Sequence, residues 1–325
     1  MQFSIVKMIV SAVFGALVSS GIDAQQQPTF HITRTFNLGG DGSWDYLRFD
    51  SAANRLFITR ATRVMVVDLT SGRLIAEIPD TPGVHGVALV PELQRGVTSN
   101  GKADTASIFN LDTLKVVNSV PTGGKPDAIL WEPHSKTVLT MNGLANSISV
   151  LDVEAAKPIA TIALPGRPET AVADAKGKVF VNLEDKAQIA EVDMRTHSVL
   201  HTWDLPGCTE PTGLAIDPEN ARLFSGCHNG VLIVVDANSG RNIQTVPIGL
   251  GVDAVAFDPA IHTVFTSNKE GTISVVRQFD ANSYRNLETV QTLPGAKTMA
   301  LDPTRHVVYT VANREGQFVL LEVGQ

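Results

Sequence analysis

The sequence predicts an all-β fold, and two observations support this prediction. A short apolar stretch recurs along the chain, and its last residue, usually an acid and often followed by proline, falls at Asp50, Val90, Glu132, Asp174, Asp217, Asp258 and Asp302. The spacings between these positions are 40, 42, 42, 43, 41 and 44 residues, and no segment longer than a few residues has a helical period. A fixed period between 20 and 50 residues indicates a repeat architecture.

Each repeat contains four predicted strands. The apolar stretch is the first, and a second apolar pair such as Val179-Phe180 follows about six residues later. A third segment with β-branched alternation closes on an acid, as in LIVVD at Asp236, and a turn such as NSG leads to the fourth. Gly, Pro, Asn and Asp at the bends are typical of antiparallel hairpins. Seven such units predict a seven-bladed β-propeller, in which each four-stranded blade buries its faces against its neighbours.

The two ends of the chain predict how the ring closes. The seventh repeat stops after FVLLEV with three strands, and the segment 33–40, TRTFNLGG, aligns with the fourth strand IATIALPG of the third repeat. We therefore expect an N-terminal strand to complete the last blade, which removes an exposed sheet edge.

The repeat resembles the YVTN family of propeller repeats, the YncE-like proteins. The tract LTMNGLANSISVLDVEAAKPIATIALPGRPETAV at 139–172 is a near match over one whole unit, and the other units match more loosely, with VFTSN at 264–268 and VYTVAN at 308–313. The second repeat lacks the aromatic residue, and the sixth has an enlarged third turn at 277–286. WD40-like and kelch signatures fit less well. The resemblance implies an exported propeller and no particular reaction, because the scaffold hosts binding proteins and enzymes alike.

Residues 1–24 read as a secretory signal peptide, which leaves 25–325 as a single propeller domain. Lys7 is the only charge before the apolar run from Ile9 to Val18, and small residues lead to a cleavage position after Ala24. The alternative is a membrane anchor, but about ten apolar residues fall short of the roughly 20 that span a bilayer. We expect no transmembrane segment after cleavage and a periplasmic or extracellular location.

The chain has two cysteines, Cys208 and Cys227. An even count in an oxidising compartment predicts one disulfide, provided that the two Cα atoms lie within about 7 Å. The alternative is a copper or nucleophile site at Cys227 and His228. The spacing of cysteine and histidine is not that of a structural zinc site.

Composition makes nucleic acid an unlikely partner. The 26 Lys and Arg residues are outnumbered by 33 Asp and Glu, which gives a net charge of −7, and aromatic residues make up only 6% of the chain. Binding to a phosphate backbone rests on excess positive charge. The expected partner is an unknown small molecule or protein.

Alternating strand direction places the start of each first strand and the end of each second strand on one face, around the mouth of the central channel. The first-strand positions are Asp45, His85, Asp127, Glu169, Thr212, Asp253 and Lys297. The second-strand ends are Arg60, Asn100, Asn142, Glu184, His228, Asn268 and Asn313. The sequence therefore predicts a polar funnel at the channel mouth.

The funnel contains the candidate metal ligands. Asp127, Glu169, Asp253 and His85, with His228 nearby, offer the carboxylate and imidazole groups that Ca²⁺, Mg²⁺ or Zn²⁺ take. The alternative is a wet channel in which each acid is solvated or paired with Lys297 or Arg60. Two functions follow from these alternatives: a scaffold that binds a ligand or protein through this face, or a metal-dependent, lactonase-like hydrolase or lyase. A compact cluster of three or four ligands with an open position would distinguish the second.

Overall fold

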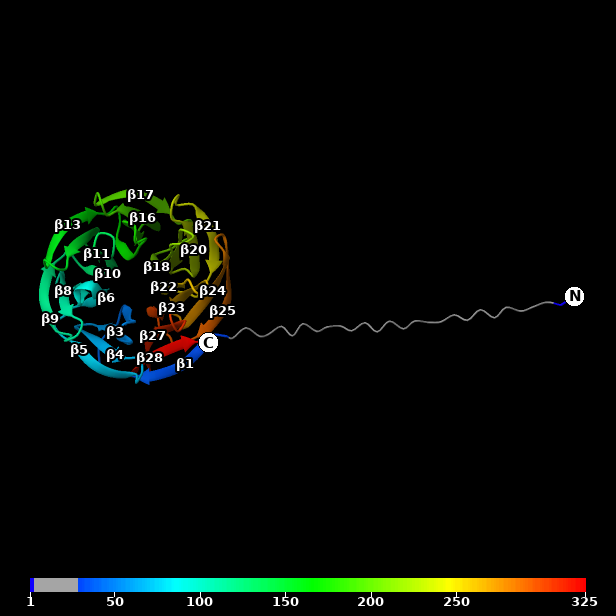
Figure 1. Cartoon of the computed structure of the whole chain (residues 1–325), viewed down its shortest axis with the longest axis horizontal. Coiled ribbons are helices and arrows are strands. Elements are labelled where there is room, and N and C mark those ends of the chain that lie inside the picture. Colours follow the sequence, from blue (N-terminus) through cyan, green and yellow to red (C-terminus); the bar gives the residue numbers. More distant parts are fainter. Residues whose placement is uncertain (3–28) are drawn as a thin grey trace.

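The computed structural model describes residues 1–2 and 29–325. Within this part of the chain the strands form seven four-stranded antiparallel sheets, which Figure 1 shows as blades around a common axis. The predicted seven-bladed propeller is therefore confirmed. The predicted signal peptide lies almost wholly outside the described residues.

In blades 1 to 6 the four strands follow one another in the chain, from the channel to the rim. Blade 1 contains β2 (Leu47–Asp50), β3 (Arg55–Arg60), β4 (Arg63–Asp68) and β5 (Arg73–Ile78). Blade 2 contains β6 (Val84–Val90), β7 (Arg95–Asn100), β8 (Thr105–Asn110) and β9 (Val116–Pro121), with the short 3₁₀ helix η1 (Pro91–Leu93) between its first two strands. Blade 3 contains β10 (Pro126–Glu132), β11 (Thr137–Asn142), β12 (Ser147–Asp152) and β13 (Lys157–Ala163).

The remaining blades have the same order except at the closure. Blade 4 contains β14 (Pro168–Ala173), β15 (Lys178–Leu183), β16 (Gln188–Asp193) and β17 (Ser198–Asp204). Blade 5 contains β18 (Pro211–Asp217), β19 (Arg222–Cys227), β20 (Val231–Asp236) and β21 (Asn242–Pro247). Blade 6 contains β22 (Val252–Asp258), β23 (Thr263–Asn268), β24 (Thr272–Asp280) and β25 (Ser283–Gln291). Blade 7 contains β26 (Met299–Asp302), β27 (Val307–Arg314), β28 (Gln317–Gly324) and, from the other end of the chain, β1 (His31–Asn37).

The N-terminal strand closes the ring as predicted. β1 pairs antiparallel with β28, with Phe36 opposite Leu320, and the two strands lie side by side in Figure 1. Phe36 also packs against the next blade, because a Cβ on Gly72 would come within 1.9 Å of the Phe36 ring. The chain ends are thus held to each other and to blade 1.

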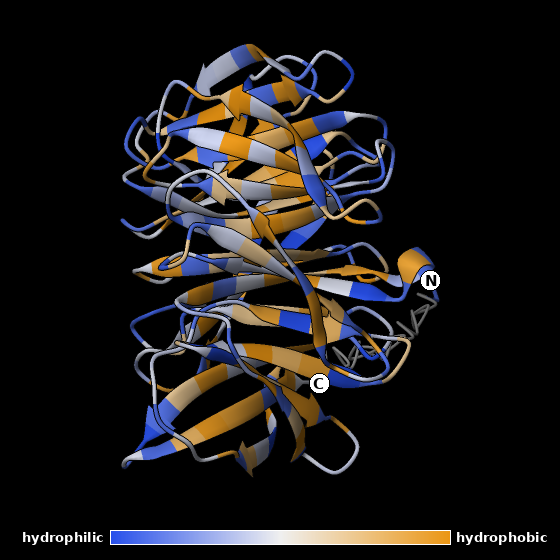
Figure 2. Ribbon diagram, turned by 90° about the vertical axis from the view of Figure 1, so that its left-hand side faces the viewer, coloured by the Kyte–Doolittle hydropathy of each residue, from blue (hydrophilic) through white to orange (hydrophobic). Residues whose placement is uncertain are grey.

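The hydrophobic core lies between neighbouring sheets. One cluster joins Met141 and Val150 of blade 3 to Val181 and Ala190 of blade 4, and Phe57 of blade 1 contacts a phenylalanine of blade 2 with ring centroids 5.7 Å apart. In Figure 2 apolar residues fill the strands while hydrophilic residues concentrate in the loops at both faces. No blade therefore buries its faces alone, which is the physical reason for the closed ring.

Blade 6 corrects one expectation. The segment 277–286 does not enlarge a turn; it lengthens β24 and β25 to nine residues each, with a turn at Ala281 and Asn282. Arg222 of blade 5 donates hydrogen bonds to the Ala281 carbonyl at 2.7 Å and to the Asn282 side chain at 3.1 Å. Pairing between β24 and β25, together with the hydrogen bonds from Arg222, satisfies backbone polar groups of this segment. The extra residues therefore form strand and not a longer turn.

Candidate functional site

The first-strand residues converge at the channel mouth because hydroxyl groups of neighbouring blades hold their backbones. Thr59 donates to the His85 carbonyl at 2.9 Å, Ser99 donates to the Asp127 carbonyl, and Thr298 donates to the Asp45 carbonyl at 2.7 Å. Each of these bonds joins one blade to the next. The contacts between blades thereby fix the backbone positions from which the polar side chains extend.

A chain of polar contacts connects five blades across this mouth. Lys297 lies 2.7 Å from Asp253 and 3.6 Å from Asp45. Nδ1 of His85 donates to Asp45 Oδ2 at 2.6 Å and lies 3.3 Å from Asp127 Oδ1. These five residues were predicted from their positions, and the structure brings their side chains into contact.

Tyr46 is a site residue that sequence reasoning missed. Its hydroxyl donates to Glu169 Oε1 at 3.1 Å and lies 3.3 Å from Thr170 Oγ1, so it joins blade 1 to blade 4. Alternation along a strand would point the residue after Asp45 away from the channel. Both residues precede β2, however, and alternation does not apply to them. The sequence feature that could have indicated this role is a tyrosine directly next to a predicted funnel acid.

Burial perturbs the titration of the funnel acids. Burial, with the charges of Asp127 and other acids, raises the pKa of Glu169 well above its usual range. Burial also raises the pKa of Asp127 to about 6, although His85 opposes the shift, and it raises the pKa of Asp253 against the effect of Lys297. Several like charges therefore share a poorly hydrated site.

The pKa values of the two cationic partners, His85 and Lys297, are also raised, which for these groups favours the charged form. Burial opposes the charged form of His85, but the hydrogen bond to Asp45 and the charge of Asp127 outweigh it and raise the pKa of His85. Burial of Lys297 is likewise outweighed by Asp253 and Asp45, which raise the pKa of the ammonium group. Both residues are therefore stabilised as cations between acids.

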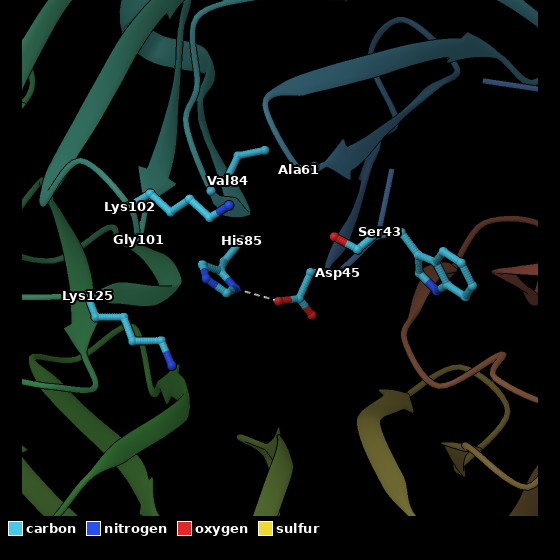
Figure 3. Close-up of a pocket in the computed structure, with 10 residues that line it drawn as sticks. Ser43, Asp45, Ala61, Val84, His85, Gly101, Lys102 and Lys125 are labelled. Carbon is cyan, nitrogen blue, oxygen red and sulfur yellow. Dashed lines mark hydrogen bonds and ion pairs between the residues drawn. The ribbon is translucent and has the colours of Figure 1, made fainter. Parts of the chain in front are cut away.

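A cavity of about 340 Å³ opens over one side of this network. Asp45 and His85 line it together with Trp44, Lys102 and Lys125. Figure 3 shows Lys102 and Lys125 extending from two neighbouring segments beside His85. Within residues 29–325 neither lysine forms an ion pair. The cavity combines acidic and imidazole groups with two cationic side chains at one place.

The structure brings together a different group of potential metal ligands from the expected one. One donor atom each from Asp45, His85 and Asp127 lie within 4.8 Å of one another. Glu169 and Asp253, which we expected in the set, are engaged by Tyr46 and Lys297 instead. The expected His85 and Asp127 are thus joined by Asp45, because blades 1, 2 and 3 are neighbours.

The second-strand residues Asn142 and Asn268 do not contribute to the funnel, contrary to expectation. The Asn142 amide donates to Ser147 and Ser149 and accepts from Thr140, all within blade 3, and Asn142 is fully buried. Asn268 makes the corresponding contacts in blade 6. Their polar groups are used inside the sheet.

Arg60 and His228 also have partners outside the funnel acids. Arg60 lies over the Phe318 ring at 3.6 Å and donates to the Gly40 carbonyl at 2.7 Å. His228 contacts Glu210 at 2.8 Å. Among the described residues the ring acids pair with Lys297, one of the two partners named in the wet-channel alternative, and not with Arg60.

Cys208 and Cys227 form a disulfide, with Cα atoms 5.4 Å apart. This pairing follows the prediction from the cysteine count and leaves no thiol for a copper or nucleophile site at Cys227. The bond joins the loop before β18 to the end of β19 within blade 5.

Fold and site together define a seven-bladed β-propeller with a polar cavity at its channel mouth. The sequence matches no family model and no curated protein. Many solved structures share the fold. One is "Kuenenia stuttgartiensis Hydrazine Synthase", with a TM-score of 0.74 and 13% identity, covering 87% of this chain and 96% of that chain. At this identity the similarity extends to the fold alone. No helix among the described residues is long and apolar enough to cross a membrane.

Proposed function

We propose that this protein is an exported β-propeller that binds a ligand in the cavity at its channel mouth. The observation that carries the proposal is the coincidence of that cavity with the contacts among Asp45, His85 and Asp127. Concave sites with a few convergent polar groups and perturbed pKa values are the usual location of ligand binding. The rigid ring supplies the preorganisation, since the binding groups come from different blades.

Export is supported by two features of different origin. The first 24 residues have the pattern of a signal peptide, and the described chain contains a disulfide, which persists in oxidising compartments. The YVTN-like repeat tract at 139–172 points to the same kind of exported propeller. A periplasmic or extracellular location follows from these features as part of the proposal.

The binding proposal is tested by a thermal-shift screen of small molecules on residues 25–325. A true ligand raises the melting temperature of the wild-type protein, and His85→Gln abolishes the effect. His228→Gln is the matched control, because His228 also contacts a carboxylate but does not line the cavity. A ligand whose effect survives His85→Gln would place binding elsewhere and contradict the proposal.

The metal-dependent hydrolase or lyase is the second candidate, and the cluster of Asp45, His85 and Asp127 beside an open cavity favours it. A metal-bound water at such a site can attack an ester or lactone. The test is a panel of lactones and esters, with and without added divalent metal. Metal-dependent turnover that is lost in His85→Gln and kept in His228→Gln supports this candidate, and its absence from the whole panel contradicts it.

A further inference from the structure

Charge compensation at the channel mouth is incomplete around Asp127. Lys297 lies between Asp253 and Asp45, and His85 donates to Asp45. The Asp127 carboxylate has the longer contact of 3.3 Å to Nδ1 of His85, and the charge of Lys125 lowers its pKa without an ion pair, but no residue of 29–325 donates a hydrogen bond to it. Its side chain is only 18% exposed. A partly buried carboxylate without a donor is costly unless a cation compensates it.

The donor set around this carboxylate suits a divalent transition metal. One imidazole nitrogen and two carboxylate oxygens lie within 4.8 Å of one another, and such mixed sets take Zn²⁺ and related ions. His85 Nδ1 and Asp45 Oδ2, now 2.6 Å apart, would have to separate to about 3.3 Å around tetrahedral Zn²⁺. A rotation of the Asp45 side chain would supply this separation, while the backbone stays in place through the hydrogen bond from Thr298 to the Asp45 carbonyl.

The same cavity also carries positive charge that a metal ion alone would not tolerate. Lys102 and Lys125 line it, and within the described chain neither has an acidic partner in an ion pair. Two ammonium groups beside a metal ion oppose its binding by repulsion. A small anion that contacts the metal and both lysines satisfies all of these charges at once.

We propose that Asp45, His85 and Asp127 hold a divalent ion of the Zn²⁺ class whose open position faces the cavity, and that a small carboxylate or phosphate ligand completes its coordination while pairing with Lys102 and Lys125. This inference rests on the proposed function, because it names the ligand class of the same cavity. It requires no catalysis.

The metal part is tested by calorimetric titration of Zn²⁺ alone into metal-free protein of residues 25–325. We expect one equivalent to bind, and affinity to fall by roughly tenfold or more in Asp127→Asn and in His85→Gln. His228→Gln should bind like the wild type, and thermal melting of each variant checks that it is folded. Absence of stoichiometric binding, or equal weakening in His228→Gln, overturns the metal site.

The anion part is tested with Co²⁺ in place of Zn²⁺, because its visible absorption reports a change of ligands. Succinate or inorganic phosphate, added separately, should alter the spectrum, and the more effective probe identifies the acid group preferred. Combined Lys102→Ala and Lys125→Ala should weaken the anion effect while Co²⁺ still binds. Lys186→Ala, in the corresponding turn of blade 4, is the control.

The outcomes separate this inference from the broader proposal. An unchanged spectrum, or equal anion binding in the double lysine variant, overturns the ligand class. If Zn²⁺ does not bind but a screened ligand still depends on His85, the inference fails and the proposed function stands. If Zn²⁺ binds but every ligand is indifferent to His85→Gln, the proposed ligand function fails.

Discussion

Single residues at the channel mouth owe their electrostatic behaviour to burial. Glu169, Asp127 and Asp253 all have a pKa raised by loss of solvent, and the cations His85 and Lys297 offset only part of that effect. Tyr46 can donate to Glu169 in either protonation state of the carboxyl group. Ionisation of these acids therefore lowers the stability of the folded protein.

Glu169→Gln should stabilise the protein in a pH-dependent way. A carboxyl group whose pKa is raised by folding makes its full contribution to stability at a pH below its pKa in the unfolded chain, near 4.5. This contribution is lost as the pH rises through the pKa that the group has in the folded protein. Glutamine keeps an acceptor for Tyr46 without the charge. We expect a melting temperature a few degrees above wild type at pH 8, and no difference at pH 4.

The control for this experiment is Glu154→Gln, an exposed carboxylate in a turn of blade 3. Its melting curves should follow wild type at both pH values. If Glu169→Gln is less stable than wild type at pH 8, the carboxylate is compensated in the fold and the assignment is wrong.

The disulfide is the second feature that acts at the scale of residues. Replacing both Cys208 and Cys227 by alanine opens a loop with a sequence separation of 19 and should lower the free energy of unfolding by about 3 kcal/mol. Urea unfolding followed by fluorescence measures the loss. Wild-type protein under dithiothreitol should show a similar loss, and full stability in that reductant would contradict the prediction.

At the scale of elements, a repeated polar network stabilises the interior of three blades. Asn100, Asn142 and Asn268 each accept from a threonine two residues earlier and donate to two hydroxyls of the next strand. The sequence signature is T-x-N followed by [ST]-x-S. Fully satisfied networks of this kind specify strand register.

Asn142→Ala should therefore be strongly destabilising. It removes three buried hydrogen bonds and leaves Ser147, Ser149 and Thr140 without that partner, at a cost of about 2–4 kcal/mol. Asn118→Ala, at an exposed position of β9, should change stability by less than about 0.5 kcal/mol. Equal urea midpoints for the two variants would show that the network contributes no stability.

The outer strands share a second feature. In each blade the outer strand has a register shift that leaves one residue unpaired, and in blades 1 to 6 that residue is apolar: Ile75, Val117, Ile159, Leu200, Ile243 and Leu287. Most of these side chains are exposed. Bulges interrupt the row of free hydrogen-bonding groups and so protect the edge against pairing with another chain.

At the scale of the whole molecule, stability depends on closure of the ring. β1 supplies the outer strand of blade 7, and Phe36 joins that strand to blade 1. Because each core cluster is shared between neighbours, an opening at one blade weakens the packing on both sides.

Protein beginning at residue 41, without β1, should test this dependence. Loss of β1 exposes the edge of β28 and part of the cluster around Phe318. We expect a lower melting temperature than for residues 25–325, together with self-association in light scattering. Identical melting and a monomeric state would show that closure by β1 is dispensable.

The sequence by itself determined the fold, because hydrophobic period and turn chemistry act locally and repeat seven times. It also determined which residues begin each first strand, and hence Asp45, His85, Asp127, Asp253 and Lys297 as members of the channel mouth. Only the tertiary structure decided which of them meet, that Tyr46 reaches Glu169, and that Asn142 and Asn268 turn into their blades. Contacts across a ring depend on blade order and side-chain direction between residues far apart in the chain, such as the 123 residues that separate Tyr46 from Glu169, and no local pattern encodes these.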